Sequence, residues 1–161
     1  MDRVNKQLWI GDFADAADYT TLKKNGIEAV VNLTNSDYTW PIYPSIKYVL
    51  KLGQDDGEPI PMAKIRLYLD HMVKYQKENL KVLVHCGAGV SRAPSFVIAW
   101  LLWPHTAEFL ATKDLLLRRL QVGELWNEYE DQLRKIRPII NPHFLLKTSI
   151  IQYFVQPLDG S

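Results

Sequence analysis

The chain has 161 residues, of which 47% are hydrophobic and 23% charged, and its formal net charge is +1. This length and composition exclude a disordered chain and predict one globular domain, over residues 1–155. Residues 156–161 (QPLDGS) have the composition of a flexible C-terminal tail. No broad basic surface is available for nucleic acid, and no apolar run reaches the roughly 18 residues that span a bilayer.

The chain contains a single cysteine, Cys86. One cysteine cannot form an internal disulfide, and the first residues lack the apolar stretch of a secretory signal, so we expect a cytoplasmic protein. The four histidines are scattered along the chain. We therefore expect neither a zinc site nor a cofactor. The sequence does not specify an oligomeric state, and a monomer is the simplest expectation.

Strand and helix patterns alternate through the first half of the chain. Residues 7–11 predict a short strand, and residues 15–26 a helix with acidic residues near its start and lysines in its last turn. The apolar, β-branched residues 27–34 predict a buried strand, and the alternating residues 46–52 predict another. The residues between these elements, 35–45 and 53–61, are typical of turns.

The second half begins with an amphipathic pattern over residues 62–78, which predicts a helix facing a sheet. Residues 80–85 form an apolar strand that leads into Cys86. The next helix should begin near Arg92 and end at Pro104; because it is apolar almost all round, we expect it at the centre of the core. Alternating strands and helices indicate an α/β fold with a partly parallel sheet. Three further helices are predicted, over 107–120, 124–136 and 141–154.

Residues 84–94 read VHCGAGVSRAP and place Cys86 at the carboxyl end of a strand, where α/β sheets bind ligands. Arg92 follows Cys86 after five uncharged residues. Two glycines let several backbone N–H groups turn inward, and such a nest at a helix N-terminus binds a tetrahedral anion. Arg92 adds a planar fork for two phosphate oxygens. The predicted phosphate-binding residues are Gly87, Ala88, Gly89, Val90, Ser91 and Arg92.

The same loop predicts a reactive sulfur at Cys86. Inward amides, a helix N-terminus and the Arg92 guanidinium all favour the thiolate, which is the nucleophilic form of cysteine. In-line attack on a phosphate ester would give a phosphocysteine, which water then hydrolyses. A lone cysteine can also be a small core hydrophobe. That alternative does not account for the two glycines, the spacing or the arginine.

The segment HCGAGVSR resembles the His-Cys-five-residues-Arg signature of cysteine-dependent protein tyrosine phosphatases, in particular the dual-specificity branch. Residues 7–34 and 134–154 resemble the same branch, and residues 104–123 match it least. The resemblance implies a central mixed, largely parallel sheet of about five strands flanked by helices. It also implies a phosphatase for phosphotyrosine, and for phosphoserine or phosphothreonine as well, in a phosphorylated protein or peptide.

A phosphatase of this kind needs a carboxylic acid to protonate the leaving oxygen. The candidates lie in residues 53–61 (GQDDGEPIP), and Asp55 fits the Asp-x-Gly-x-Pro pattern of the resembled family. The resemblance therefore favours Asp55 as the acid, with Asp56 as the alternative. His85 also matches the signature, and we expect it to support the loop backbone.

One position departs from the family pattern: Ala93 stands where the family usually has Ser or Thr, whose hydroxyl helps the sulfur leave. Without that hydroxyl, either hydrolysis of the phosphocysteine is slow, or the hydroxyl of Ser91 or a water molecule takes its place. This departure leaves open a catalytically weak phosphopeptide-binding module. An aromatic loop can border the pocket and stack on a phenyl or sugar ring, or simply pack against the core. Its aromatic residues are Tyr38, Trp40 and Tyr43.

Two other enzymatic alternatives remain at this point. A phosphatase for a non-protein substrate would act on a phosphoglucan or a phosphoinositide, although the uncharged loop residues disfavour the lipid. Sulfur transfer by a rhodanese-type loop also uses a cysteine in an amide cradle. Those loops are generally shorter, and the flanking segments do not match them.

Overall fold

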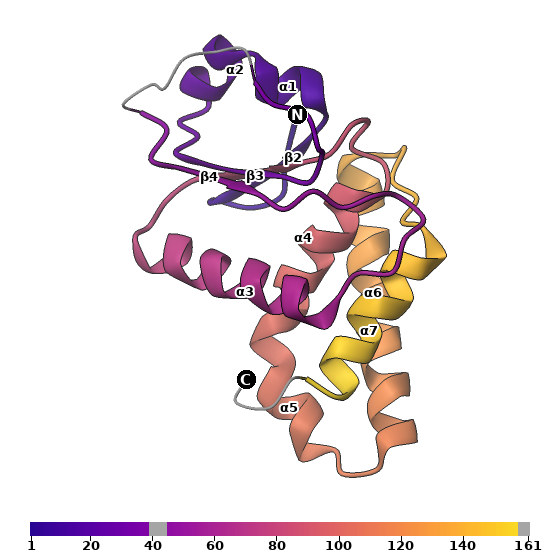
Figure 1. Ribbon diagram of the computed structural model, residues 1–161. Helices are drawn as coiled ribbons and strands as arrows, with labels where there is room; N and C mark the ends of the chain where they lie inside the picture. The colour runs from indigo at the N-terminus through magenta and orange to yellow at the C-terminus, as the bar shows by residue number, and fades with distance from the viewer. Residues whose placement is uncertain (39–44, 158–161) are drawn as a thin grey trace.

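The computed structural model describes residues 1–38 and 45–157, and a single sheet crosses its middle (Figure 1). In this part of the chain the sheet has five strands in the order β1-β2-β5-β3-β4. Neighbouring strands are parallel except for β1, which pairs antiparallel with β2. The prediction of a mixed, largely parallel sheet of about five strands is confirmed. The strands are β1 (Asp2–Arg3), β2 (Leu8–Gly11), β3 (Ala29–Asn32), β4 (Tyr48–Lys51) and β5 (Val82–His85).

Helices cover both faces of the sheet, with α1 and α2 on one side and the longer helices on the other (Figure 1). Each face buries its own apolar cluster, and the larger one lies on the side of the long helices. Two faces covered by helices explain why the central strands are apolar along their whole length. The helices are α1 (Phe13–Ala17), α2 (Tyr19–Lys24), α3 (Met62–Lys77), α4 (Arg92–Leu102), the 3₁₀ turn η1 (Trp103–His105), α5 (Thr106–Ala111), α6 (Leu115–Ile136) and α7 (Phe144–Val155).

Strand β5 and helix α4 form the centre of the molecule. β5 lies between β2 and β3, and all four of its residues are buried. Eight of the eleven residues of α4 are buried too. The Tyr68 hydroxyl of α3 donates a hydrogen bond of 2.6 Å to the Phe96 carbonyl of α4, and the two rings meet edge to face. The prediction of a buried helix beginning at Arg92 is confirmed, so the β5–α4 connection starts and ends on well-packed backbone.

Two helical regions differ from the sequence prediction. The helix predicted over 15–26 is divided at Asp18, whose backbone is extended and whose side chain accepts hydrogen bonds from the first N–H groups of α2. Conversely, the helices predicted over 107–120 and 124–136 are replaced by the short α5 and the 22-residue α6, which runs through Gly123. Asp114 caps α6 by accepting from the N–H groups of Leu116 and Leu117. An aspartate whose side chain accepts hydrogen bonds from the next N–H groups favours a helix start at its position over a helix that continues through it. Both helix boundaries therefore follow from side-chain hydrogen bonds.

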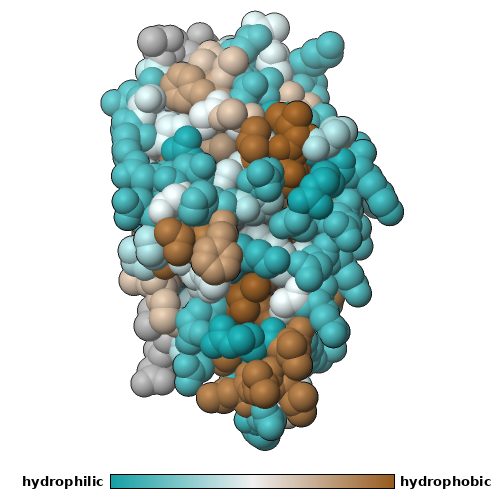
Figure 2. Space-filling model, turned by 90° about the vertical axis from the view of Figure 1, so that its right-hand side faces the viewer, coloured by the Kyte–Doolittle hydropathy of each residue, from teal (hydrophilic) through white to brown (hydrophobic). Residues whose placement is uncertain are grey.

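The surface carries an apolar patch where α5 meets the first turns of α6 (Figure 2). It consists of the exposed leucines Leu110, Leu115, Leu116, Leu117 and Leu120. Within the described residues, no helix has both the length and the apolar character needed to cross a membrane. Helix α7 ends at Val155, where we predict the end of the domain. Of the predicted tail, residues 158–161 lie outside the described residues.

Candidate active site

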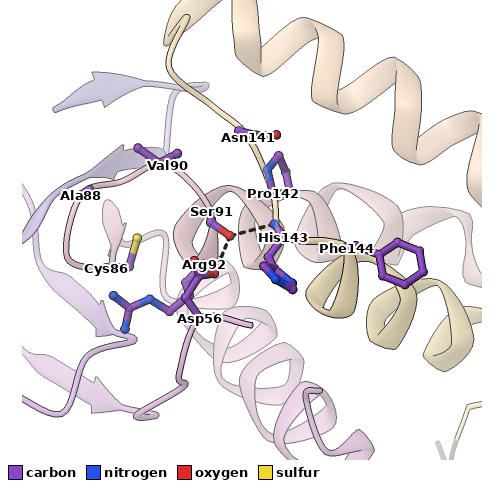
Figure 3. Close-up of a pocket in the computed structure, with 10 residues that line it drawn as sticks. All are labelled: Asp56, Cys86, Ala88, Val90, Ser91, Arg92, Asn141, Pro142, His143 and Phe144. Carbon is purple, nitrogen blue, oxygen red and sulfur yellow. Dashed lines mark hydrogen bonds between the residues drawn. The ribbon is translucent and has the colours of Figure 1, made fainter. Parts of the chain in front are cut away.

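The loop that joins β5 to α4 places the sulfur of Cys86 at one side of an open cavity of about 570 Å³ (Figure 3). The Cys86 side chain is 2% exposed, and its Sγ accepts a hydrogen bond of 3.4 Å from the backbone N–H of Ala93, in the first turn of α4. A thiolate at this position is therefore stabilised by the helix N-terminus. The loop residues that line the cavity are Cys86, Ala88, Val90, Ser91 and Arg92.

The Arg92 guanidinium turns back over the loop (Figure 3). Its Nη1 donates to the Gln54 carbonyl at 3.0 Å and to the Leu33 carbonyl at 3.5 Å. Its Nη2 would lie 3.1 Å from a Cβ placed on Gly87, so glycine there leaves room for the guanidinium. These contacts fix the side chain beside the sulfur, with donor groups available to an anion in the cavity.

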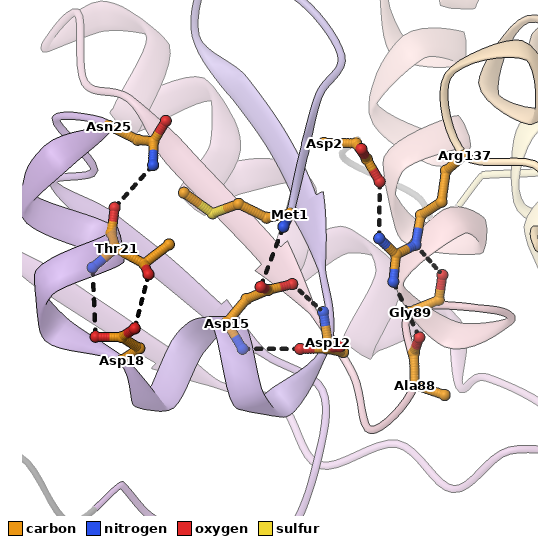
Figure 4. A network of polar contacts seen from close by, with 10 residues as sticks. All are labelled: Met1, Asp2, Asp12, Asp15, Asp18, Thr21, Asn25, Ala88, Gly89 and Arg137. Atoms are coloured by element: carbon orange, nitrogen blue, oxygen red, sulfur yellow. Dashed lines mark hydrogen bonds and ion pairs between the residues drawn. The ribbon is translucent and has the colours of Figure 1, made fainter.

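The loop backbone is held from outside by Arg137, which follows α6 (Figure 4). Its Nε donates to the Gly89 carbonyl at 2.9 Å and its Nη2 to the Ala88 carbonyl at 3.1 Å, while Nη1 binds the Asp2 carboxylate at 2.7 Å. In a trans peptide the C=O and N–H point in opposite directions. Carbonyls turned out toward Arg137 therefore turn the N–H groups of Gly89 and Val90 the other way. Neither Arg137 nor Asp2 is among the site residues predicted from the sequence.

Gly89 is required by this arrangement. Its φ is +68°, a conformation that only glycine adopts without strain. A Cβ at this position would also lie 2.8 Å from the Gly11 carbonyl oxygen and 2.6 Å from the Arg137 guanidinium. Close packing of the loop against β2 therefore explains the second glycine.

His85 lies below the loop and is hydrogen-bonded to its backbone. Its Nδ1 lies 3.2 Å from the Cys86 carbonyl oxygen, and its Nε2 is hydrogen-bonded to the Tyr38 hydroxyl. A carbonyl oxygen can only accept, so Nδ1 carries the proton and Tyr38 donates to Nε2. Burial lowers the pKa of His85 to about 4, which keeps the ring neutral. Tyr38 thus lies under the loop and does not line the cavity, while Trp40 and Tyr43 lie outside the described residues.

The two candidate acids lie differently. Asp56 lines the cavity, and its Oδ1 accepts a hydrogen bond of 2.6 Å from the Ser91 hydroxyl (Figure 3). Asp55 is exposed and lies outside the cavity lining, with its Oδ1 3.4 Å from the Asn35 amide nitrogen. A contact of that length is weak. Of the two, Asp56 is the one that faces the loop.

The opposite wall of the cavity consists of Asn141, Pro142, His143 and Phe144, which precede and begin α7. It is attached to the loop by two hydrogen bonds: the His143 N–H donates to the Ser91 hydroxyl at 2.8 Å, and the Asn141 N–H donates to the Val90 carbonyl at 2.7 Å. The sequence predicts a last helix from residue 141, whereas α7 begins at Phe144. These residues lie in the segment that resembles the dual-specificity branch, but no local pattern shows that they reach the cavity, because tertiary packing brings them there. Among the described residues, no group of three or more His, Cys, Asp or Glu is placed to hold a metal ion.

Known proteins resemble this chain in sequence and in fold. The family model described as "Dual specificity phosphatase, catalytic domain" matches residues 8–156. The chain belongs to this family. Among curated relatives, the dual specificity phosphatase domain is 27% identical to mouse dual specificity protein phosphatase 14 over 157 residues, covering 94% of this chain and 67% of the relative. It is 28% identical to mouse dual specificity protein phosphatase 15, covering 89% of this chain and 53% of the relative. This chain thus spans between half and two thirds of these proteins.

Solved structures share the fold of the dual specificity phosphatase domain. The crystal structure of DUSP15 has a TM-score of 0.72 at 22% identity and covers 97% of this chain and 90% of that chain. The tyrosine phosphatase OH1 from the Orf virus has the same TM-score and identity, with 96% and 86% covered. Human tyrosine phosphatase-like serine/threonine/tyrosine-interacting protein has a TM-score of 0.68 at 22% identity, with 95% and 93% covered. The resemblance to the dual-specificity branch is confirmed.

The position after the loop arginine remains distinctive in this phosphatase domain. Ala93 provides its N–H to the sulfur but has no hydroxyl. The two nearest serines in sequence are engaged elsewhere, since the Ser91 hydroxyl donates to Asp56 and the Ser95 hydroxyl donates to the Ser91 carbonyl. In this arrangement the hydrogen bond from Ala93 is made by backbone alone.

Proposed function

We propose that the protein hydrolyses phosphate monoesters of tyrosine, and of serine and threonine as well, through a phosphocysteine formed on Cys86. The observation that carries this proposal is the position of the sulfur, which faces an open cavity between a buried strand and a helix N-terminus. The thiolate attacks phosphorus, the bond to the leaving oxygen breaks, and water later displaces the sulfur. Arg92 and the N–H groups of residues 87–92 bind the phosphoryl oxygens and stabilise their charge in the transition state.

We propose Asp55 as the proton donor to the leaving oxygen. Its weak contact with Asn35 leaves the carboxyl free to turn toward the cavity rim. Asp56 forms a short, charge-assisted hydrogen bond with Ser91, which suits it to anchor residues 54–58 against the loop. Asp56 remains the alternative donor because it already faces the cavity.

A second candidate function is phosphopeptide binding with little or no turnover. Ala93 favours it, because no hydroxyl at this position assists departure of the sulfur in the second step. The structural similarity to human tyrosine phosphatase-like serine/threonine/tyrosine-interacting protein is in line with it. In this case phosphate would bind in the same loop, and either no phosphocysteine would form or it would persist.

The substrate we propose is a phosphorylated protein or peptide in the cytoplasm, where the thiol stays reduced. The cavity lining contains one cationic side chain, Arg92, among the described residues. One guanidinium suits a singly phosphorylated group better than a headgroup with several phosphates. We therefore rank a phosphoinositide, and with it a phosphoglucan, below a phosphopeptide.

The test compares hydrolysis of p-nitrophenyl phosphate and of a phosphotyrosine peptide by the wild type, Cys86→Ser, Asp55→Asn and Asp56→Asn. Cys86→Ser should abolish turnover and still bind the phosphopeptide. Replacing the true donor should slow peptide hydrolysis by about 10²–10⁴-fold. The loss should be smaller for p-nitrophenyl phosphate, whose leaving group is less basic than the tyrosine phenolate, which has a solution pKa of about 10.

Each result has a distinct meaning. Equal loss in Asp55→Asn and Asp56→Asn contradicts the choice of Asp55. Phosphopeptide binding by a wild type that hydrolyses neither substrate supports the second candidate function. Unchanged turnover in Cys86→Ser would remove the phosphocysteine mechanism altogether.

A further inference from the structure

The cavity extends well beyond the place where a phosphate group would sit. Its volume of about 570 Å³ lies in the range of pockets that enclose a whole small molecule. Figure 3 shows Cys86 and the Arg92 guanidinium on one side and Phe144 on the other, with its ring directed away from the sulfur. A phosphoryl group bound by the loop therefore leaves the Phe144 end of the cavity open to another part of the substrate.

Phe144 is an exception among the aromatic residues near the loop, because its side chain is 70% exposed. Tyr38, by comparison, is largely buried and packs against the His85 ring. An exposed apolar ring at the mouth of a cavity gains free energy when a ligand covers it, since apolar surface leaves water. Pro142 adds a second apolar side chain to this end of the cavity, beside the polar side chains of Asn141 and His143.

The backbone that carries the ring is also held at a fixed place relative to the loop. His143 is the N-cap of α7: its Nδ1 accepts from the Leu145 N–H at 3.0 Å, and its own N–H binds the Ser91 hydroxyl. Phe144 is the first residue of that helix. A contact residue on a capped helix end, tied to the loop by hydrogen bonds, is preorganised for a ligand that is also bound by the loop.

We propose that Phe144 binds an apolar side chain located one or two residues from the phosphorylated residue of a peptide substrate. Neighbouring residues of an extended peptide are about 3.5 Å apart, so such residues extend beyond the phosphorylated side chain toward the far end of the cavity. Among the described lining residues no lysine or arginine lies at this end to select an acidic flank, because the one arginine, Arg92, lies on the side of the sulfur. The proposal rests on the proposed function for the position of the phosphate.

The experiment uses phosphotyrosine peptides that differ by Leu or Ser at one of the positions −2, −1, +1 and +2. At one position or more, kcat/KM of the wild type should be about 10-fold higher for Leu than for Ser. Phe144→Ser should reduce this ratio to below about 2-fold, and Phe144→Leu should keep most of it. Because the readout is a ratio within one variant, a general loss of activity does not affect it.

The matched control is Leu116→Ser. Leu116 is as exposed as Phe144, at 69%, but lies at the first turn of α6, whereas the cavity lies near the other end of that helix. A helix of 22 residues is about 33 Å long. This variant should keep both the wild-type activity and the Leu preference. A preference lost equally in Leu116→Ser and Phe144→Ser would overturn the proposal.

Binding to Cys86→Ser separates this proposal from the proposed function. If the wild type hydrolyses p-nitrophenyl phosphate but shows no Leu preference at any position, the role of Phe144 is wrong and the phosphatase function stands. If nothing is hydrolysed but Cys86→Ser binds Leu peptides more tightly in a Phe144-dependent manner, the binding role stands and the enzymatic function fails. A Phe144-dependent loss of phosphoglucan or phosphoinositide turnover, without any peptide preference, also overturns the proposal.

Discussion

The loop from Cys86 to Arg92 and the wall formed by Asp56 and residues 141–144 enclose one cavity, yet different forces hold them. The loop begins at the last residue of β5, which is buried, and ends at the first residue of α4, whose next seven residues are all buried. The wall is largely exposed and is attached to the loop through hydrogen bonds that converge on Ser91 and Val90. The loop is therefore anchored in the core at both ends and supported by Arg137 from outside, whereas the wall depends on a few polar contacts.

This difference separates two kinds of task. Phosphate binding and nucleophilic attack need groups placed to within fractions of an ångström, and a packed core supplies that precision. Substrate selection depends on the wall, where contacts are individually weak, and the proposed proton donor Asp55 lies beside the wall and outside the cavity lining. Substitutions in the loop should consequently impair chemistry, and substitutions in the wall should alter how the substrate is held.

Among substitutions that leave the proposed nucleophile and both candidate acids intact, Arg92→Lys in the loop should have the largest effect. Lysine keeps the charge but loses the planar fork for two phosphoryl oxygens and the hydrogen bonds to Gln54 and Leu33. We expect kcat/KM to fall by about 10²–10³-fold, or roughly 3–4 kcal/mol of transition-state stabilisation. The measurement is steady-state hydrolysis of p-nitrophenyl phosphate.

Arg137→Lys is the matched control, because Arg137 contacts the loop carbonyls from outside and not the cavity. Arg137→Lys should lower kcat/KM by about 10-fold, since Arg137 acts on the bound phosphate only through the loop backbone. If Arg137→Lys were as damaging as Arg92→Lys, the view that Arg92 binds the phosphoryl group directly would be wrong.

The next largest effect concerns the free energy of unfolding of the protein at low pH, which depends on His85 under the loop. Burial lowers the pKa of His85 from 6.5 to about 4 in the folded protein. Between these pH values the unfolded chain therefore binds a proton at His85 that the folded chain does not bind. The stability linked to His85 is complete above pH 6.5 and is lost as pH falls from 6.5 toward 4. The loss should reach about 3 kcal/mol in the free energy of unfolding.

Urea unfolding at pH 7, 6, 5 and 4 measures this loss. His85→Gln should show a shallower dependence over the same range, because glutamine does not titrate. Identical curves for the wild type and His85→Gln would show that other groups cause the pH dependence.

A smaller effect is expected from Ser91→Ala, which detaches the wall. The Asp56 carboxylate and the His143 N–H would each lose a partner, which should cost about 1–2 kcal/mol of stability. We expect kcat/KM for a phosphopeptide to fall by about 10-fold because the wall is less well placed. Ser95→Ala removes a buried hydroxyl of the same helix that does not contact the wall. A similar kinetic loss in Ser95→Ala would show that detachment of the wall is not the cause.

The smallest effect should come from Ala93→Ser. The change supplies a hydroxyl next to the sulfur, where the backbone N–H of residue 93 is already 3.4 Å away. Hydrolysis of the phosphocysteine should accelerate by about 3–10-fold, as expected for one added hydrogen bond to the leaving sulfur. Rapid-quench kinetics should show a burst of product in the wild type and a reduced burst in Ala93→Ser. Absence of a burst in the wild type would place the slow step elsewhere.

The site illustrates what local sequence can predict. Cys86, the glycines and Arg92 lie within seven consecutive residues, and their chemistry follows from their spacing on a strand–loop–helix unit. The sheet and the buried α4 were predictable for a similar reason, since apolar periodicity is a local signal. Capping contacts were harder to predict. Asp18 and Asp114 cap α2 and α6 through side-chain hydrogen bonds that composition alone does not reveal, and the helix boundaries therefore differ from the predicted ones.

The amino-acid order by itself therefore determined the fold class and the strand–loop–helix unit that carries the proposed nucleophile and the proposed phosphate-binding loop. Only the tertiary structure decided that Arg137 and Asp2, 135 residues apart, hold that loop from outside, and that His143 and Phe144 complete the cavity. It also decided that Asp56, and not its neighbour Asp55, faces Ser91. The physical reason is the sequence separation of the groups. Groups within one segment are brought together by their spacing along the chain. Contacts between distant segments depend on how the whole core packs.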